Sequence, residues 1–153
     1  CCTMGADQMR HPFPKKTITS RFGTTARRLT AHRGLDYAPK EGTKIPAVAD
    51  GTIQTVKFSK ILGWVLVQSA WDAIKGRTVF VGYCHLQEKP TLKVGDRVKE
   101  GQPIGKVGNT GSASRGAHLH LTIGPRVTSV FMGVVFDPEI FIDEQIAHAK
   151  LEA

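Results

Sequence analysis

Short runs of β-branched and aromatic residues, separated by glycine-containing turns, are the feature that most limits the fold of this 153-residue chain. Residues of these types favour strands because they pack well on a pleated surface. The pair Asp50-Gly51 predicts a hairpin turn between Ala47–Val48 and the run that follows, since glycine tolerates positive φ. The pattern indicates a mainly β domain of antiparallel sheets. Strands are expected over Thr52–Phe58, Trp64–Val67, Thr78–Leu86 and His118–Ile123.

One helix is predicted, and it lies at the C-terminus. Asp137 can cap its first turn, and Pro138 fits the first helical position, where a missing N–H costs nothing. Ile142, Ile146 and Ala149 then recur at i, i+4 and i+7, the spacing of an apolar helical stripe. The expected organisation is an N-terminal arm (residues 1–14), a β domain (15–137) and a short C-terminal helix (138–153).

Composition places the chain among globular proteins, with 41% hydrophobic and 22% charged residues. Its length suits one domain, and we favour a monomer. No stretch approaches the ~18 apolar residues of a membrane span. No secretory signal is visible at the N-terminus.

The net charge of +8, from 21 Lys+Arg against 13 Asp+Glu, suits a polyanionic partner. Nucleic acid, an anionic membrane face and the acidic polymers of a bacterial wall all qualify. Nucleic-acid binding requires a recognisable motif or interleaved aromatic residues, which the sequence lacks, so we expect no nucleic-acid partner. A basic surface without a dedicated partner explains the charge equally well.

The segment Ala117–Ile123 is the most informative in the chain. His118, His120 and Thr122 alternate with three aliphatic residues, so a strand here carries the three polar groups on one face. Neighbouring side chains on that face lie ~6.5–7 Å apart. Either both imidazoles bind one metal ion, or one binds it while the other acts on the substrate. Two partly exposed histidines on a solvated face are the alternative.

Further donors lie earlier in the chain. His32 and Asp36 are four residues apart, with Gly34 between them to let the backbone bend, and imidazole nitrogen and carboxylate oxygen are suitable zinc ligands. His85 ends an alternating run and, taken alone, is more typical of a strand-end histidine than of a catalyst. Cys84 is expected to point away from His85 as a buried structural thiol. One face of this run is expected to carry Val79, Val81, Tyr83 and His85, and the other Phe80, Gly82, Cys84 and Leu86.

Together these residues predict a catalytic zinc site. His32, Asp36 and one histidine of the pair His118 and His120 give three ligands and an open fourth position, as catalytic zinc requires. The residues leave open which of the two histidines binds the metal. His85 and the remaining one are available for proton transfer, since no His-Glu-x-x-His segment supplies a glutamate base. The other histidines, His11 and His148, are expected to be surface residues.

The sequence resembles the M23 (lysostaphin-like, LytM) zinc metallopeptidases, which cut peptide bonds in bacterial peptidoglycan. The resemblance covers Ile18 to Pro138. Its landmarks, in chain order, are Thr19–Gly23, His32–Tyr37, Pro46–Gly51, Tyr83–Leu86, Gly95–Gln102, Gly105–Gly111 and His118–His120.

The resemblance implies antiparallel sheets forming an open groove. It also implies a zinc endopeptidase that hydrolyses peptide cross-links of peptidoglycan at the bacterial cell wall. By the same resemblance, His32, Asp36 and His120 are the ligands of one zinc ion. His85 and His118 are the two catalytic histidines that do not bind the metal.

Four residues are candidates for substrate binding. Thr110, Ser112 and Arg115 lie in the loop Asn109–Arg115, before the catalytic strand. We expect this loop either to wall a groove for a flexible peptide or to be a plain polar connector. Tyr83 is expected either to hydrogen-bond near the oxyanion or to pack at the end of its strand.

Two other functions compete with catalysis. A non-catalytic LytM-like protein binds the wall or activates another hydrolase, but such proteins lack metal-site residues, and all five positions are filled here. The segment Gly95–Gln102 also resembles the hairpin of biotinyl and lipoyl carrier domains, an interpretation that leaves the histidines unexplained.

The sequence is compatible with several biological settings. The chain suits a bacteriophage lysin, a virion-associated enzyme or the mature domain of an exported bacteriolytic enzyme. For the bond cut, we favour D-alanyl-diaminopimelate over glycyl-glycine, because nothing in the sequence marks a glycine-specific groove.

Overall fold

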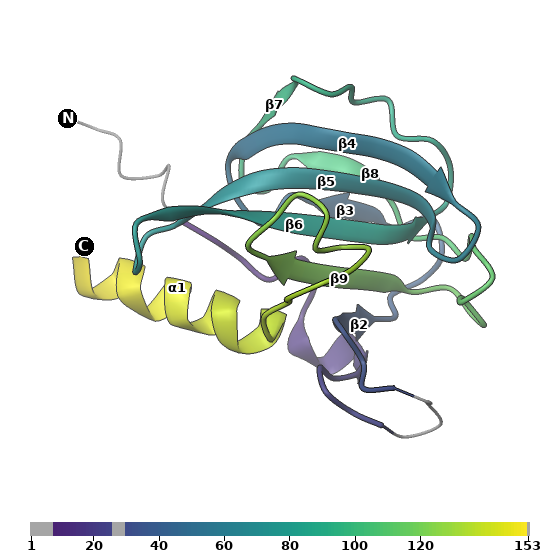
Figure 1. Ribbon diagram of the computed structural model, residues 1–153, viewed down its shortest axis with the longest axis horizontal. Helices are drawn as coiled ribbons and strands as arrows, with labels where there is room; N and C mark the ends of the chain where they lie inside the picture. The colour runs from purple at the N-terminus through teal and green to yellow at the C-terminus, as the bar shows by residue number, and fades with distance from the viewer. Residues whose placement is uncertain (1–7, 26–29, 153) are drawn as a thin grey trace.

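The computed structural model describes residues 8–25 and 30–152. A seven-stranded antiparallel sheet has the order β1-β2-β9-β6-β5-β4-β7, and β3 pairs with β8 in a second sheet (Figure 1). The mainly β fold with antiparallel sheets and a C-terminal helix is therefore confirmed. The strands are β1 (Ile18–Ser20), β2 (Leu35–Tyr37), β3 (Lys44–Pro46), β4 (Gly51–Ser59), β5 (Gly63–Asp72), β6 (Arg77–Leu86), β7 (Arg97–Val98), β8 (Pro103–Lys106) and β9 (Leu119–Gly124). A 3₁₀ turn, η2 (Lys15–Thr17), precedes β1, and the helix α1 spans Pro138–Glu152.

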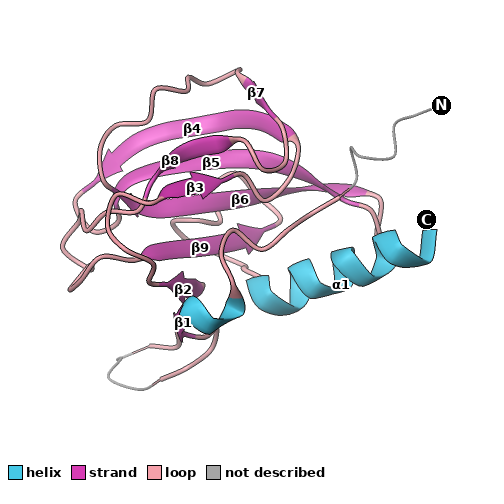
Figure 2. Ribbon diagram, turned by 180° about the vertical axis from the view of Figure 1, so that it is seen from behind, coloured by secondary structure: helices cyan, strands magenta, loops and turns pink. Residues whose placement is uncertain are grey.

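The main hydrophobic core lies between the two sheets, which overlap in the view of Figure 2. Leu66 and Leu121 of the large sheet pack there with Ile45 of β3 and Ile104 of β8. Because strand side chains alternate between faces, the neighbours of these residues point to the other side of the large sheet. A smaller apolar cluster lies on that side and contains Val65, Val67, Cys84 and Val130. One face of the large sheet is thus used for stability, and the other carries the candidate site.

The helix follows its sequence signals. The Asp137 carboxylate accepts the backbone N–H groups of Glu139 and Ile140, at 3.0 and 3.3 Å, as an N-cap does. Ile142 is buried and Ile146 packs against the core. The predicted helix is confirmed over Pro138–Glu152, and residue 153 lies outside the described residues.

The expected N-terminal arm is in part packed against the domain. Residues 1–7 lie outside the described residues, but Met9 and Phe13 belong to the main core. His11, expected at the surface, instead lies 2.7 Å from the Asp143 carboxylate of α1 and 3.3 Å from the Tyr37 hydroxyl. This segment therefore joins the sheet to the helix, a long-range contact that no local pattern signals.

The predicted alternation along β6 is wrong at its end. His85 has a φ of 63°, and Val65 of β5 lies opposite both Cys84 and His85, since Trp64 pairs with Leu86 and Leu66 with Tyr83. This is a β-bulge, in which one extra residue shifts the side chains that follow to the other face. Leu86 therefore joins Tyr83 in the main core, while Cys84 lies on the opposite face. Cys84 is fully buried, as expected of a structural thiol.

The hairpin predicted at Asp50-Gly51 is also wrong. The strand before it, β3, pairs with β8 in the other sheet, and Gly51 is the first residue of β4. A Cβ atom at Gly51 would lie 1.8 Å from the Ser69 carbonyl oxygen. The glycine is required by the close approach of β5 and not by a turn.

Candidate metal centre and groove

A groove of about 1060 Å³ lies on the face of the large sheet that carries the small cluster. Apolar side chains from two loops line it, Ile61 and Leu62 between β4 and β5, and Val130 and Phe131 between β9 and α1. The residues expected to bind metal or to act in catalysis all line the same groove: His32, Asp36, His85, His118 and His120. The fold therefore gathers them from three separate parts of the chain.

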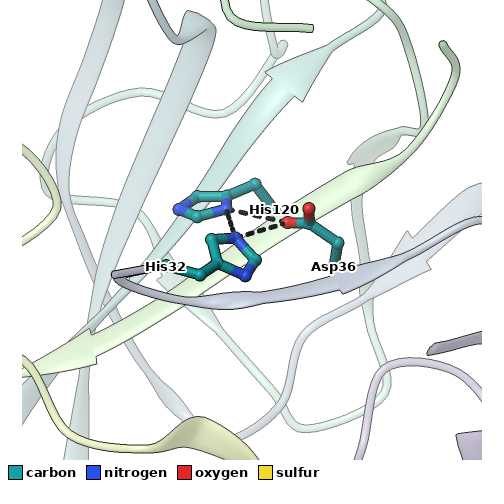
Figure 3. Close-up of side chains that lie close together, drawn as sticks. All are labelled: His32, Asp36 and His120. Carbon is teal, nitrogen blue, oxygen red and sulfur yellow. Dashed lines mark hydrogen bonds and ion pairs between the residues drawn. The ribbon is translucent and has the colours of Figure 1, made fainter. Parts of the chain in front are cut away.

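The three expected metal ligands converge on one point (Figure 3). Asp36 in β2 lies directly opposite His120 in β9, and His32 precedes β2 by three residues. Asp36 Oδ1 is 2.8 Å from His120 Nδ1 and 3.2 Å from His32 Nε2. His32 Nε2 is 3.1 Å from His120 Nδ1. Three potential ligand atoms thus form a nearly equilateral triangle.

This triangle fits a zinc ion. Zinc binds imidazole nitrogen and carboxylate oxygen at ~2.0–2.2 Å in tetrahedral sites, so that neighbouring ligand atoms lie about 3.3 Å apart. The second nitrogen of His32, Nδ1, lies 3.2 Å from the Arg21 carbonyl oxygen, which can only accept a hydrogen bond. Nδ1 therefore carries the proton, and Nε2 presents its lone pair to the triangle, the outer-sphere arrangement typical of metal-binding histidines.

The local electrostatics favour the deprotonated forms that metal binding requires. Burial raises the pKa of Asp36, but the contacts with the His120 and His32 rings lower it more, so that the pKa lies well below its usual range. Burial also lowers the pKa of His120, and the Asp36 carboxylate offsets only part of this effect. The triangle therefore offers a carboxylate and a neutral imidazole at neutral pH.

His85 and His118 lie side by side next to this triangle, with ring centroids 4.7 Å apart. The Nδ1 of each ring donates to a main-chain carbonyl, of Thr110 at 2.6 Å for His85 and of Gly116 at 2.8 Å for His118. In the neutral ring the other nitrogen, Nε2, is then the basic one. Burial lowers the pKa of His85 to about 4, against a smaller opposing effect of the Thr110 carbonyl, so this ring is neutral at pH 7. In each ring Nε2 is thus the nitrogen that can accept a proton.

Gly34 is required by the space around the triangle. A Cβ atom there would lie 2.5 Å from the Leu121 carbonyl oxygen and 2.7 Å from the His120 ring. The sequence predicts that Gly34 lets the backbone bend, but its φ is not positive, and close packing is the stronger reason for a glycine here.

We predict that Gly34→Ala weakens both folding and metal binding, because the added methyl group displaces the strand β9 or the His120 ring. Overpacking of this kind typically costs ~1–3 kcal/mol in the free energy of unfolding. Denaturant unfolding of the metal-free protein and chelator competition for Zn²⁺ measure the two effects. Gly116→Ala is the matched control, since a Cβ atom at Gly116 meets nothing within 4 Å. Equal stability and zinc affinity in both variants would contradict the packing argument.

Only some of the candidate substrate-binding residues line the groove in the structure. Ser112 and Arg115 line the groove. Thr110 does not expose its hydroxyl there, because Oγ1 donates to the Leu86 carbonyl and accepts the Trp64 N–H. Its carbonyl orients His85 instead.

The prediction that Tyr83 binds substrate in the groove is wrong. It is fully buried on the core face of the large sheet. Its hydroxyl donates to the side chain of Gln68 and accepts the backbone N–H of Val48. Tyr83 therefore holds the large sheet to the segment that follows β3, and it has no contact with the groove.

Among the groove residues that sequence reasoning missed are Arg33, Val130 and Phe131. The two apolar residues belong to a loop that folds back over the sheet, and an apolar run in a loop carries no signal for such a position. Arg33 lies between His32 and Gly34, in the segment that supplies two of the expected metal ligands. This position in the sequence is the one signal that could have pointed to it.

Comparisons with known proteins decide the family. The sequence profile described as Peptidase family M23 matches residues 30–137. The chain belongs to this family. The expected resemblance is thereby confirmed.

Relatives of known name agree with this membership. Peptidoglycan DD-endopeptidase ShyC of Vibrio cholerae is 33% identical over 118 residues, which is 73% of this chain and 25% of ShyC. Glycyl-glycine endopeptidase ALE-1 of Staphylococcus capitis is 37% identical over 103 residues, 65% of this chain and 25% of ALE-1. Murein hydrolase activator EnvC of Escherichia coli is 30% identical over 113 residues, 73% of this chain and 26% of EnvC. The chain thus spans about a quarter of the length of these relatives.

Solved structures show the same fold. The structure of LytU superposes with a TM-score of 0.69 at 32% identity, covering 93% of this chain and 96% of that one. The antimicrobial peptidase lysostaphin from Staphylococcus simulans has a TM-score of 0.69 at 27% identity, covering 84% of this chain and 50% of that one. Within the described part of the chain, no helix has the length and apolar character needed to cross a membrane.

Proposed function

We propose that this chain is a zinc-dependent endopeptidase that hydrolyses peptide cross-links of bacterial peptidoglycan. His32, Asp36 and His120 hold one zinc ion, and His85 and His118 are the catalytic residues. The observation that carries the proposal is the meeting, in one groove, of a triangle of ligand atoms and a second pair of histidines. Membership of family M23 and the similarity to ShyC support it.

The bound zinc ion supplies a Lewis acid that polarises the scissile carbonyl and lowers the pKa of water. The remaining chemistry belongs to His85 and His118. Because Nδ1 of each ring donates to a carbonyl, Nε2 carries the lone pair that accepts the proton of the attacking water. The same nitrogen, once protonated, donates a hydrogen bond to the negative oxygen of the transition state and then returns its proton to the leaving amine.

The groove offers the substrate an open approach. Ser112 and Arg115 line it as candidate contacts with the peptide, and Val130 and Phe131 line it as well. We favour the D-alanyl-diaminopimelate bond, in line with the DD-endopeptidase name of ShyC, although ALE-1 is named for the glycyl-glycine bond. Action at the bacterial wall follows from this substrate, whether a phage or an export route delivers the protein, and we propose that the chain acts as a monomer.

Digestion of purified sacculi tests this proposal. The zinc-loaded protein is expected to release soluble muropeptides whose masses show cleavage at D-alanyl-diaminopimelate. A chelator should stop release, and added Zn²⁺ should restore it. Sacculi with glycine bridges serve as the matched substrate. Faster release from them would identify glycyl-glycine as the bond that is cut, and the proposed endopeptidase activity would still stand. No release from either type by a zinc-loaded protein would contradict the proposal.

The similarity to EnvC favours one other function, that of a non-catalytic protein that activates a separate wall hydrolase. In that case the protein should stimulate a partner hydrolase and keep this effect in the presence of chelator. The filled metal and histidine positions argue for catalysis, because a pure activator has no need of them.

A further inference from the structure

The loop of residues 125–136, which joins β9 to α1, folds back over the sheet face that carries the site (Figure 1). We call it the wall loop. The wall loop packs closely against two glycines of the sheet. A Cβ atom at Gly82 would lie 2.5 Å from Val130 Cγ2, and one at Gly124 would lie 2.4 Å from Ser129 Cβ. Ser129 and Val130 are accordingly buried, although they belong to a loop.

Arg33 joins this loop to the metal-binding segment. Its Nη2 donates to the carbonyl oxygen of Ser129 at 3.0 Å and to that of Gly133 at 2.9 Å. Both are charge-assisted hydrogen bonds, which are stronger than bonds between neutral groups. Since Arg33 directly follows His32, one short segment holds both a candidate zinc ligand and the wall loop.

The position of the wall loop sets the shape of the groove. Val130 and Phe131 line the groove together with the histidines, and Phe131 also packs against the small apolar cluster of Val65, Val67 and Cys84. Lys57 of β4 lies over the Phe131 ring, with Nζ 5.0 Å from its centroid. A shift of the loop therefore moves an apolar surface that lies beside the reacting groups.

We propose that Arg33 is a positioning residue for the substrate: it fixes the wall loop so that Val130 and Phe131 form an apolar wall against which the bound peptide packs. This inference rests on the proposed function. It assigns to Arg33 an effect on peptide binding and none on the metal, because its guanidinium bonds are to the loop carbonyls.

Arg33→Met tests the inference with two independent readouts. The first is amide hydrogen exchange, which requires no activity. The N–H groups of Ser129, Phe131 and Met132 bond to carbonyls within the wall loop, so their exchange reports its opening. We expect this exchange to rise at least about tenfold, as local opening becomes easier. Arg126→Met is the matched control, because it removes the same charge from the loop itself, where Arg126 is exposed and donates through its backbone N–H.

The second readout is steady-state cleavage of a soluble cross-linked muropeptide by the zinc-loaded protein. We expect kcat/KM to fall by about 10- to 100-fold in Arg33→Met, mainly through KM, with zinc content unchanged. Phe131→Ala should raise KM in the same way without faster exchange at Ser129, because it removes the wall and leaves the Arg33 bonds intact.

Unchanged exchange in Arg33→Met would overturn the inference, even with a raised KM, because Arg33 would then act on the substrate directly. Loss of zinc in this variant would overturn it too, because Arg33 would then act through His32. Faster exchange with unchanged kinetics would contradict the claim that Val130 and Phe131 form a wall against which the peptide packs. If the wild-type protein cleaves nothing, the proposed function fails, and the exchange readout alone still decides whether Arg33 holds the loop.

Discussion

His120→Ala is expected to abolish zinc binding and peptidoglycan cleavage together. His120 supplies one corner of the ligand triangle and bonds to both other members. Its removal leaves two ligands, too few for a catalytic zinc site, which has three protein ligands. Elemental analysis should fall from about one zinc per chain to near zero, and the cleavage rate by about 10³-fold or more, as loss of a metal Lewis acid worth several kcal/mol implies.

The matched control for His120→Ala is His148→Ala. This variant removes a histidine of α1 that does not line the groove, so zinc content and rate should stay at wild-type values. Far-UV circular dichroism of both variants checks that the sheet is retained. Full zinc content and full activity in His120→Ala would exclude the ligand assignment.

His85→Ala and His118→Ala are expected to keep zinc and lose turnover. Neither residue belongs to the triangle, and both present a basic Nε2 beside it. General acid–base catalysis by a side chain contributes typically ~10²–10⁴-fold, so kcat should fall by this factor with KM little changed. Zinc content is measured on the same samples.

His85 calls for a second variant because its backbone is unusual. A φ of 63° is costly for most residues, and asparagine is among the few that adopt it readily. His85→Asn therefore keeps the bulge while removing the basic nitrogen, and it should lose turnover as His85→Ala does. Wild-type kcat in His85→Asn would show that His85 only shapes the strand.

These two experiments separate the roles of the groove histidines. Zinc loss with rate loss marks a ligand, whereas rate loss alone marks a group that moves protons. Asp36→Asn adds a check on the first class, because an amide cannot replace the carboxylate charge beside His120 and His32. We expect it to behave as His120→Ala does.

The position of His85 shows where sequence reasoning reached its limit. The run from Val79 alternates as a strand should, and continued alternation places His85 among core residues. The bulge opposite Val65 interrupts the alternation, so that the His85 side chain lines the groove instead. A bulge depends on the pairing of two strands, so the sequence of one strand does not reveal it.

Tyr83 and Gly51 are similar cases. The sequence leaves two roles open for Tyr83, a hydrogen bond near the oxyanion or packing at the end of its strand, and the structure places its hydroxyl in the core, bonded to Gln68 and Val48. Asp50-Gly51 predicts a turn because glycine tolerates positive φ, yet the close approach of the Ser69 carbonyl explains the glycine at position 51. In both positions a contact with a distant residue decides what the local pattern leaves ambiguous.

The sequence by itself determined the strand and helix types, the alternation that puts His118 and His120 on one face, the helix cap at Asp137 and the family. These properties depend on residue preference and on spacing along a few positions, which the chain carries locally. Tertiary structure alone decided that β2 pairs with β9, that His85 lines the groove and that Arg33 donates a hydrogen bond to the Ser129 carbonyl of the wall loop. Each of these depends on contacts between segments far apart in the chain, whose register is fixed only when the whole sheet and its core pack together.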